Sequence, residues 1–155
     1  MARVQPRRRR VLVVDDDPAT VDWLKMVIEQ APVEPGFDVR SAALGRTGLA
    51  VFDEWRPDLV LLDLLLPDGD GMDVLKRMAQ NKQSEDIPVI VMTAAGTIPD
   101  AVEAMRHGAY DFLTTPLEKH HPLIVLHEAL DRDPLERPLA ALRSDVQNRH
   151  ATRAG

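Results

Sequence analysis

The sequence contains no cysteine, and only 4% of its residues are aromatic. Without cysteine the chain has no disulfide, no thiol nucleophile and no cysteine-ligated zinc site. It has no apolar run near the roughly 20 residues that a membrane span requires. Its N-terminus also lacks the apolar stretch of a signal peptide. We therefore expect a cytoplasmic protein that does not bind membranes.

An excess of positive charge is absent as well. The 155 residues carry a formal net charge of −6, whereas proteins that bind nucleic acid need clustered Lys and Arg to neutralise phosphates. We therefore expect no direct nucleic-acid binding by the main body of the chain. The exception in charge is Arg7 to Arg10, which predicts a disordered basic lead-in over residues 1–9, with an anion-binding arm as the alternative.

The length suits one domain of ordinary size, which we place at residues 10–131. Pro134 and Pro138 then punctuate a linker over residues 132–155. Within this segment Leu139, Leu142 and Val146 follow the 3-4 spacing of a helix. The segment therefore resembles a truncated C-terminal helix that is too short to hold a dimer by itself.

Strand-like and helix-like patterns alternate through the predicted domain. Such alternation favours right-handed crossovers and a parallel sheet with helices on both faces. We predict an α/β flavodoxin-like fold, doubly wound, with five strands in the order 2-1-3-4-5. The strands are expected at 11–14, 37–40, 59–62, 88–92 and 110–114, and the apolar helix faces at 21–28, 48–55, 72–79, 101–105 and 123–130.

Acidic residues stand at the ends of two predicted strands. Asp15 and Asp16 follow the apolar run VLVV, and Asp63 follows LVLL. The first and third strands are neighbours in this fold, so the carboxylates should meet at the edge where such sheets bind ligands. Adjacent carboxylates repel each other unless a cation compensates. A further strand, IPVIVM, ends at the hydroxyl of Thr93, and acids, a hydroxyl and a metal are typical of phosphoryl chemistry.

Simpler interpretations exist for these residues. The acids at 15 and 16 would be ordinary turn residues if no cation were bound, and a threonine at a strand end often only satisfies backbone groups. Asp17 precedes Pro18, a pair that suits a helix N-cap followed by proline at the first helical position. We therefore assign Asp17 to capping and not to a metal.

Four motifs occur in a fixed order: VLVVDDDP, LVLLDLLLPDGDG, IPVIVMTA and AVEAMRHGAYDFLTTP. Together they resemble the receiver domain of bacterial two-component response regulators, over residues 10–130. The stretch AVEAMRHGAYDFL is especially similar to the receivers of NtrC-type enhancer-binding transcription activators.

The resemblance implies that Asp63 is the phosphoacceptor, which takes a phosphoryl group from a sensor histidine kinase. It implies that Mg²⁺ is held by Asp16, Asp63 and the backbone carbonyl of Leu65, with Asp15 acting mostly through water. Mg²⁺ suits such a set because it accepts few carboxylates and keeps several waters. A receiver of this kind is a signalling domain, which catalyses only its own phosphorylation and dephosphorylation.

The resemblance also implies a conformational switch. Thr93 matches the hydroxyl that bonds the phosphoryl group, and Phe112 matches the aromatic residue that turns inward with it. The change would control dimerisation or the activity of an output, and in NtrC-type regulators that output is transcription. Phosphorylation would act by shifting the population between two conformers.

One position departs from the family pattern. The family has a lysine immediately before the proline that follows the fifth strand, and this chain has Thr115 before Pro116. The peptide bond before that proline is usually cis in the family. Threonine cannot supply the ammonium group that the lysine would place on the phosphoryl oxygens. A second interpretation therefore stays open, a pseudo-receiver that acts as a phosphorylation-independent interaction module. A third is a phosphatase of the haloacid dehalogenase type, but its D-x-D-x-T pattern fits only Asp15 and Asp17, since residue 19 is alanine.

We predict that Thr115→Lys strengthens the binding of beryllofluoride, a phosphoryl mimic, in the presence of Mg²⁺. A charge-assisted contact contributes about 1.5–3 kcal/mol, which corresponds to roughly one to two orders of magnitude in affinity. Titration of the parent and the variant measures the difference. Equal affinities would show that residue 115 does not limit the site.

Overall fold

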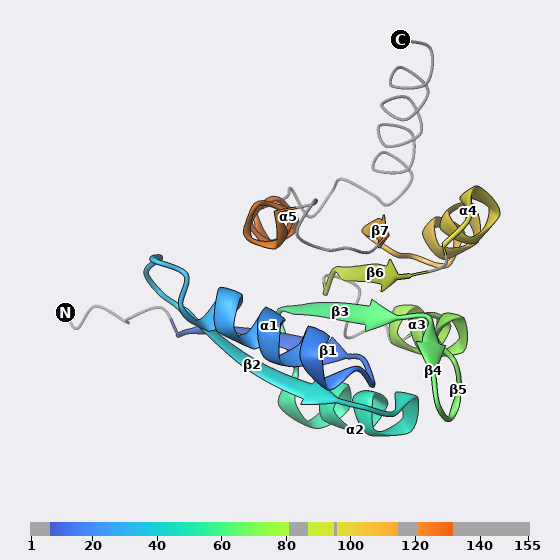
Figure 1. Cartoon of the computed structure of the whole chain (residues 1–155), viewed down its shortest axis with the longest axis horizontal. Helices are drawn as coiled ribbons and strands as arrows, with labels where there is room; N and C mark the ends of the chain where they lie inside the picture. The colour runs from blue at the N-terminus through green and yellow to red at the C-terminus, as the bar shows by residue number, and fades with distance from the viewer. Residues whose placement is uncertain (1–6, 81–86, 95, 115–120, 132–155) are drawn as a thin grey trace, which may run out of the picture.

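The computed structural model describes residues 7–80, 87–94, 96–114 and 121–131. They form a five-stranded parallel sheet in the order β2-β1-β3-β6-β7 with helices on both faces (Figure 1). Because β6 and β7 are the fourth and fifth strands of this sheet along the chain, the order is the predicted 2-1-3-4-5, and the predicted fold class is confirmed. The strands are β1 (Arg9–Val14), β2 (Phe37–Ala42), β3 (Leu59–Asp63), β6 (Val89–Thr93) and β7 (Asp111–Thr114), and the helices are α1 (Pro18–Glu29), α2 (Gly45–Trp55), α3 (Gly71–Gln80), α4 (Ile98–Arg106) and α5 (Pro122–Leu130).

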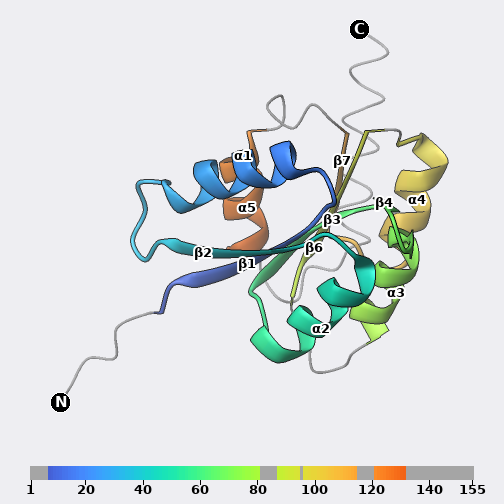
Figure 2. The same cartoon turned by 60° about the horizontal axis from the view of Figure 1, so that its bottom comes forward.

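The sheet separates two apolar layers. Helices α1 and α5 cover one face, and α2, α3 and α4 cover the other (Figure 2). Successive side chains of a strand point to opposite faces, so Leu12 and Val14 enter one layer while Val11 and Val13 enter the other. All four are fully buried. This two-sided burial explains why the strands appear in the sequence as continuous apolar runs.

The register of the strands aligns their carboxyl ends. Val14 of β1 lies opposite Leu62 of β3, and Asp63 lies opposite Met92 of β6. Asp15 directly follows Val14, and Thr93 directly follows Met92. The sheet therefore delivers the polar residues of three neighbouring strands to a single edge.

A small antiparallel hairpin follows β3 that the sequence did not predict. It consists of β4 (Leu65–Leu66) and β5 (Gly69–Asp70). Strands of two residues are too short to show a period of two in the sequence. The hairpin leads directly from the end of β3 into α3.

Residues 7–9 of the basic segment, for which we expected a disordered lead-in over residues 1–9, are described in the structure. Arg7 pairs with Asp58 at 2.9 Å, Arg8 with Asp38 at 2.8 Å, and Arg9 is already in β1. The partner carboxylates lie in β2 and directly before β3. A count of charges along the sequence does not show these pairs. Residues 1–6 lie outside the described residues.

The last described residue, Asp131, is held from two sides. His127 of α5 lies 3.0 Å from one of its carboxylate oxygens, and the guanidinium of Arg9 lies 3.4 Å from the other. Arg9 is the first residue of β1. The end of α5 is therefore fixed beside the amino end of the central strands.

Several predictions fall outside the described residues, namely those for Thr115, for Pro116 and its peptide bond, and for residues 132–155. The described residues have a cis peptide bond at Glu34–Pro35. Among them, no helix has the length and apolar character needed to cross a bilayer.

Gly71 begins α3 directly against the backbone of β3. Its N–H donates to the Leu64 carbonyl at 2.8 Å. A Cβ at this position would lie 2.2 Å from the carbonyl oxygen of Asp63 and 2.6 Å from Cα of Leu64. Backbone atoms cannot move aside as the end of a side chain can, so only glycine fits here.

We predict that Gly71→Ala destabilises the protein by about 3 kcal/mol, because the added methyl group forces the Asp63 backbone out of place. Urea unfolding followed by circular dichroism measures the change. Gln80→Ala, at the exposed end of the same helix, serves as the control and should change stability by less than about 0.5 kcal/mol. Equal stabilities of the two variants would refute the close contact.

Candidate functional site

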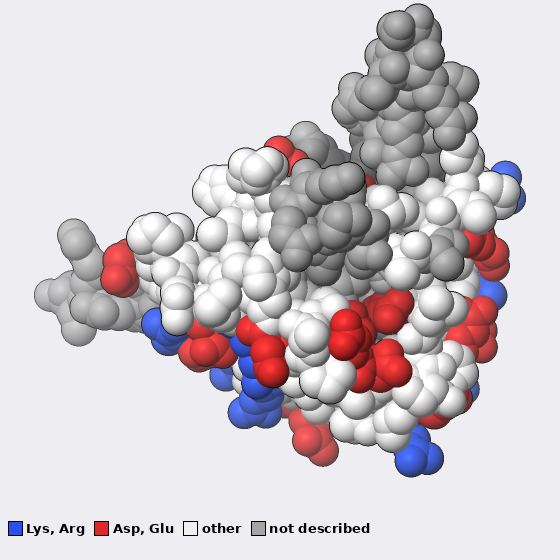
Figure 3. Space-filling view, viewed as in Figure 1, with Lys and Arg blue, Asp and Glu red and all other residues white. Residues whose placement is uncertain are grey.

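Three carboxylates meet at the carboxyl edge of the sheet. One ligand oxygen from each of Asp15, Asp16 and Asp63 lies within 4.8 Å of the others. Figure 3, viewed as Figure 1, shows a compact acidic group over the ends of β1 and β3. The structure thus brings together the acids that the strand ends predicted.

The carboxylate of Asp63 is partly buried, and its Oδ1 accepts the N–H of Leu65 at 3.1 Å. Burial, together with the charges of Asp15 and Asp16, raises its pKa from 3.8 to about 6. Asp15 is 8% exposed and accepts the N–H of Asp17 at 2.9 Å. Burial raises its pKa as well. The site therefore holds negative charge that is poorly solvated.

No basic side chain compensates this charge among the residues that the structure describes. None of their ion pairs includes Asp15, Asp16 or Asp63. Closely spaced carboxylate oxygens that are half removed from water favour a hard divalent cation. The donor set therefore fits Mg²⁺, which binds through one or two carboxylates and retains several waters.

Asp17 belongs to the helix and not to the acidic cluster. It is the N-cap of α1, and its Oδ1 accepts the N–H of Ala19 at 3.3 Å. The hydroxyl of Thr20 donates to Oδ2 at 2.6 Å, and this hydrogen bond is the main reason that the pKa of Asp17 is lowered. The capping prediction is confirmed. Asp17, which would be the second acid of a D-x-D-x-T pattern, is therefore used to cap the helix.

Thr93, the hydroxyl residue, and Phe112, the aromatic residue, are both buried close to Gly96. Thr93 is 4% exposed and Phe112 is 1% exposed. A Cβ at Gly96 would lie 2.6 Å from the Phe112 ring and 2.8 Å from Cγ2 of Thr93. The ring of Phe112 is therefore inside the protein, beneath the segment that joins β6 to α4.

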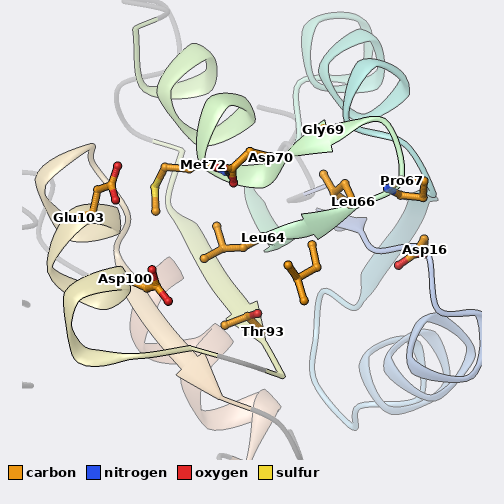
Figure 4. Close-up of a pocket in the computed structure, with 11 residues that line it drawn as sticks. Asp16, Leu64, Leu66, Pro67, Gly69, Asp70, Met72, Thr93, Asp100 and Glu103 are labelled. Atoms are coloured by element: carbon orange, nitrogen blue, oxygen red, sulfur yellow. Dashed lines mark hydrogen bonds between the residues drawn. The ribbon is translucent and has the colours of Figure 1, made fainter.

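A cleft of about 690 Å³ opens from this edge of the sheet (Figure 4). Thr93 lies in its floor, the β4–β5 hairpin and the start of α3 form one wall, and α4 forms the other. Two acids of α4, Asp100 and Glu103, were missed by the sequence reasoning. Their i, i+3 spacing places them on one side of the helix, but the sequence does not say what that side faces. The lining residues are Asp16, Leu64, Leu65, Leu66, Pro67, Gly69, Asp70, Met72, Thr93, Asp100 and Glu103.

Residues 11–126 match the response regulator receiver domain, which is three quarters of the chain. The chain belongs to this family. Receiver domains are signalling domains of two-component systems, so the recognition from the four motifs is confirmed.

Its curated relatives are regulators that are longer than this chain. The receiver is 37% identical over 139 residues to the DNA-binding dual master transcriptional regulator RpaA of Synechocystis, covering 90% of this chain and 56% of that protein. It is 41% identical over 118 residues to the regulatory protein LuxO of Vibrio cholerae, covering 76% and 24%. The regulatory protein AtoC of Escherichia coli is 33% identical over 141 residues, covering 91% and 28%. This chain therefore covers between 24% and 56% of the length of these three relatives.

Solved structures agree with the fold. A response regulator from Chloroflexus aurantiacus superposes with a TM-score of 0.73 at 30% identity, covering 81% of this chain and all of that one. The signal receiver domain of a LuxO repressor protein from Vibrio parahaemolyticus gives 0.68 at 30% identity, covering 90% and 97%.

We predict that Asp63→Asn stabilises the metal-free receiver at pH 7.5. The folded-state pKa of Asp63 lies above the ordinary value of 3.8, so its ionisation costs stability above about pH 6 and the cost is relieved as the pH falls toward 4. After discounting for solvent screening, the gain is about 1–2 kcal/mol at pH 7.5.

Urea unfolding in a chelator between pH 7.5 and pH 5 measures this difference, which should shrink as the solution becomes more acidic. Asp53→Asn, on the exposed side of α2, is the matched control and should show no such trend. A gain for Asp63→Asn that does not depend on pH would contradict the assigned origin.

Proposed function

We propose that this receiver accepts a phosphoryl group on Asp63 from the phosphohistidine of a sensor kinase. The observation that carries the proposal is the cluster of Asp15, Asp16 and Asp63 at the strand ends that also carry the buried Thr93, next to a cleft that Asp16 and Thr93 line. A carboxylate oxygen of Asp63 attacks phosphorus, the P–N bond to the donor imidazole breaks, and the nitrogen keeps that electron pair. The product on the receiver is an acyl phosphate.

The residues that would hold Mg²⁺ are Asp16, Asp63 and the backbone carbonyl of Leu65, with Asp15 acting through water. A bound cation neutralises phosphoryl oxygens as the donor approaches. Ionised Asp63 is both the nucleophile and a ligand, so its raised pKa makes both roles sensitive to acid. Asp15 reaches the same site from the residue after β1, and its burial limits how much water can screen the charge there.

Thr93 and Phe112 are the proposed switch. The Thr93 hydroxyl donates to a phosphoryl oxygen on Asp63, and this contact exists only in the phosphorylated protein. The Phe112 ring and Cγ2 of Thr93 both lie close to Gly96. A phosphoryl group that draws Thr93 toward Asp63 thereby favours the conformer in which the ring stays inside.

The output of the domain is a separate part of the proposal. The relatives are regulatory proteins, and one is a DNA-binding transcriptional regulator. We propose that this receiver, at residues 10–131, controls transcription in the cytoplasm through a change of conformation or dimerisation, with residues 132–155 as the linker to what it controls. The receiver itself would not bind DNA or a membrane.

The pseudo-receiver remains the second candidate because Thr115 replaces the family lysine. Loss of that ammonium group removes a charge-assisted contact to the phosphoryl oxygens. It does not remove the acids, so metal binding alone cannot separate the two candidates.

The deciding experiment is incubation with a small phosphodonor and Mg²⁺, followed by intact mass and mapping of the modified residue. We predict one added phosphoryl group on Asp63, no addition in Asp63→Asn, and none when Mg²⁺ is chelated. Asp53→Asn is the control and should be modified like the parent.

Other outcomes each select another function. Modification of Asp15 would support the phosphatase reading. No modification, with unchanged spectra and oligomeric state in Mg²⁺ and beryllofluoride, would support the pseudo-receiver.

A further inference from the structure

Helix α2 begins without a cap from its own N-terminal residues. Its N-cap residue is Leu44, whose side chain makes no capping hydrogen bond. The cap comes instead from Asp68, in the turn between β4 and β5. Its Oδ1 accepts the N–H of Gly45 at 2.8 Å, and its Oδ2 accepts the N–H of Arg46 at 3.1 Å. These N–H groups have no partner within the helix, and a carboxylate there also meets the positive end of the helix dipole.

The start of α2 lies close against the hairpin and α3. A Cβ at Gly45 would lie 2.8 Å from Cγ2 of Val74, 3.4 Å from Oδ1 of Asp68 and 3.5 Å from Cδ1 of Leu66. The absence of a side chain at residue 45 therefore lets the helix reach the hairpin turn. The hydrogen bonds from Gly45 and Arg46 lower the pKa of Asp68, so its carboxylate stays ionised at neutral pH.

The hairpin connects this contact to the acidic cluster. At its base, the Gly71 N–H donates to the Leu64 carbonyl at 2.8 Å and the Leu65 N–H donates to Oδ1 of Asp63 at 3.1 Å. At its turn, Pro67 and Asp68 are exposed. Among the described residues, the turn is joined to the rest of the domain by the two hydrogen bonds that Asp68 accepts from α2. The hairpin is therefore fixed at both ends.

We propose that Asp68 is a positioning residue for the phosphoacceptor site. By holding the hairpin turn on α2, it keeps the Leu65 backbone in place, and through the Leu65 N–H it keeps the Asp63 carboxylate in the orientation that a metal requires. The same contact holds the hairpin wall of the cleft, to which Leu66 and Gly69 belong. The inference rests on the proposed function, since the Leu65 carbonyl and Asp63 are proposed metal ligands.

The test compares Asp68→Ala and Asp68→Asn with the parent in the full 155-residue chain. Amide hydrogen exchange is measured at Gly45, Arg46 and Leu65 without metal, and Mg²⁺ affinity is measured by titration. For Asp68→Ala we expect exchange about tenfold faster at all three amides and Mg²⁺ binding weakened by about three- to tenfold, since each lost hydrogen bond corresponds to roughly tenfold in an equilibrium. Asp68→Asn, whose amide keeps one acceptor oxygen, should be intermediate.

Ile28→Val is the control for a loss of stability alone. Ile28 is buried in the layer beneath α1, on the other side of the sheet. This variant should lower the urea midpoint while leaving Mg²⁺ affinity and the local exchange of Leu65 unchanged.

Each result decides between roles. Faster exchange at Gly45 and Arg46 with unchanged Leu65 exchange and unchanged Mg²⁺ affinity would make Asp68 a helix cap only and overturn the proposal. A parent protein without any Mg²⁺ response would refute the proposed metal site, and Leu65 exchange would still decide whether Asp68 positions the hairpin. If Asp68→Ala does not fold, Asp68→Asn is judged by the same criteria.

Discussion

The repulsion among three carboxylates at one end of the sheet is the constraint on which the site depends. Asp15, Asp16 and Asp63 would separate if their backbones were free, because burial and like charge both disfavour their ionised forms. They are held together by the register of β1 and β3, in which Val14 lies opposite Leu62. Residues 11–14 of β1 and 59–62 of β3 are buried between two layers of helices, so the packing of the domain maintains a charge arrangement that is unfavourable by itself. Such stored repulsion is what a cation can relieve on binding.

The groups around the acids each restrict them in a different way. The Leu65 N–H orients Asp63, the Asp17 N–H orients Asp15, and Gly71 lets α3 begin directly behind the β3 backbone. Beyond them, Asp68 joins the hairpin to a helix that comes earlier in the chain. Backbone N–H groups therefore orient two of the three acids, and the cleft beside them is lined by Asp16 and Thr93.

Much of the fold was predictable, because fully buried parallel strands leave continuous apolar runs such as VLVV and LVLL, and their ends mark one edge of the sheet. The capping role of Asp17 was predictable too, since its partners lie two and three residues away. The contacts of Asp68 with Gly45 and of Arg7 with Asp58 were not predictable, because they join residues 23 and 51 positions apart. The hairpin of β4 and β5 was missed because four paired residues carry no periodic signal. Asp100 and Glu103 were missed because the tilt of α4 over the sheet is a tertiary property.

The ion pair between Arg9 and Asp131 has a consequence for communication over distance. It anchors the exit of the chain from α5 at the amino end of β1, whereas the acids gather at the carboxyl end. A strand of five or six residues spans about 17–20 Å, and that length separates the acidic cluster from Asp131 at the end of α5. If Asp63 accepts a phosphoryl group, as we propose, the effect must travel the length of the sheet or of α5 to reach Asp131, so the rigidity of the packed layers would govern how well it is transmitted.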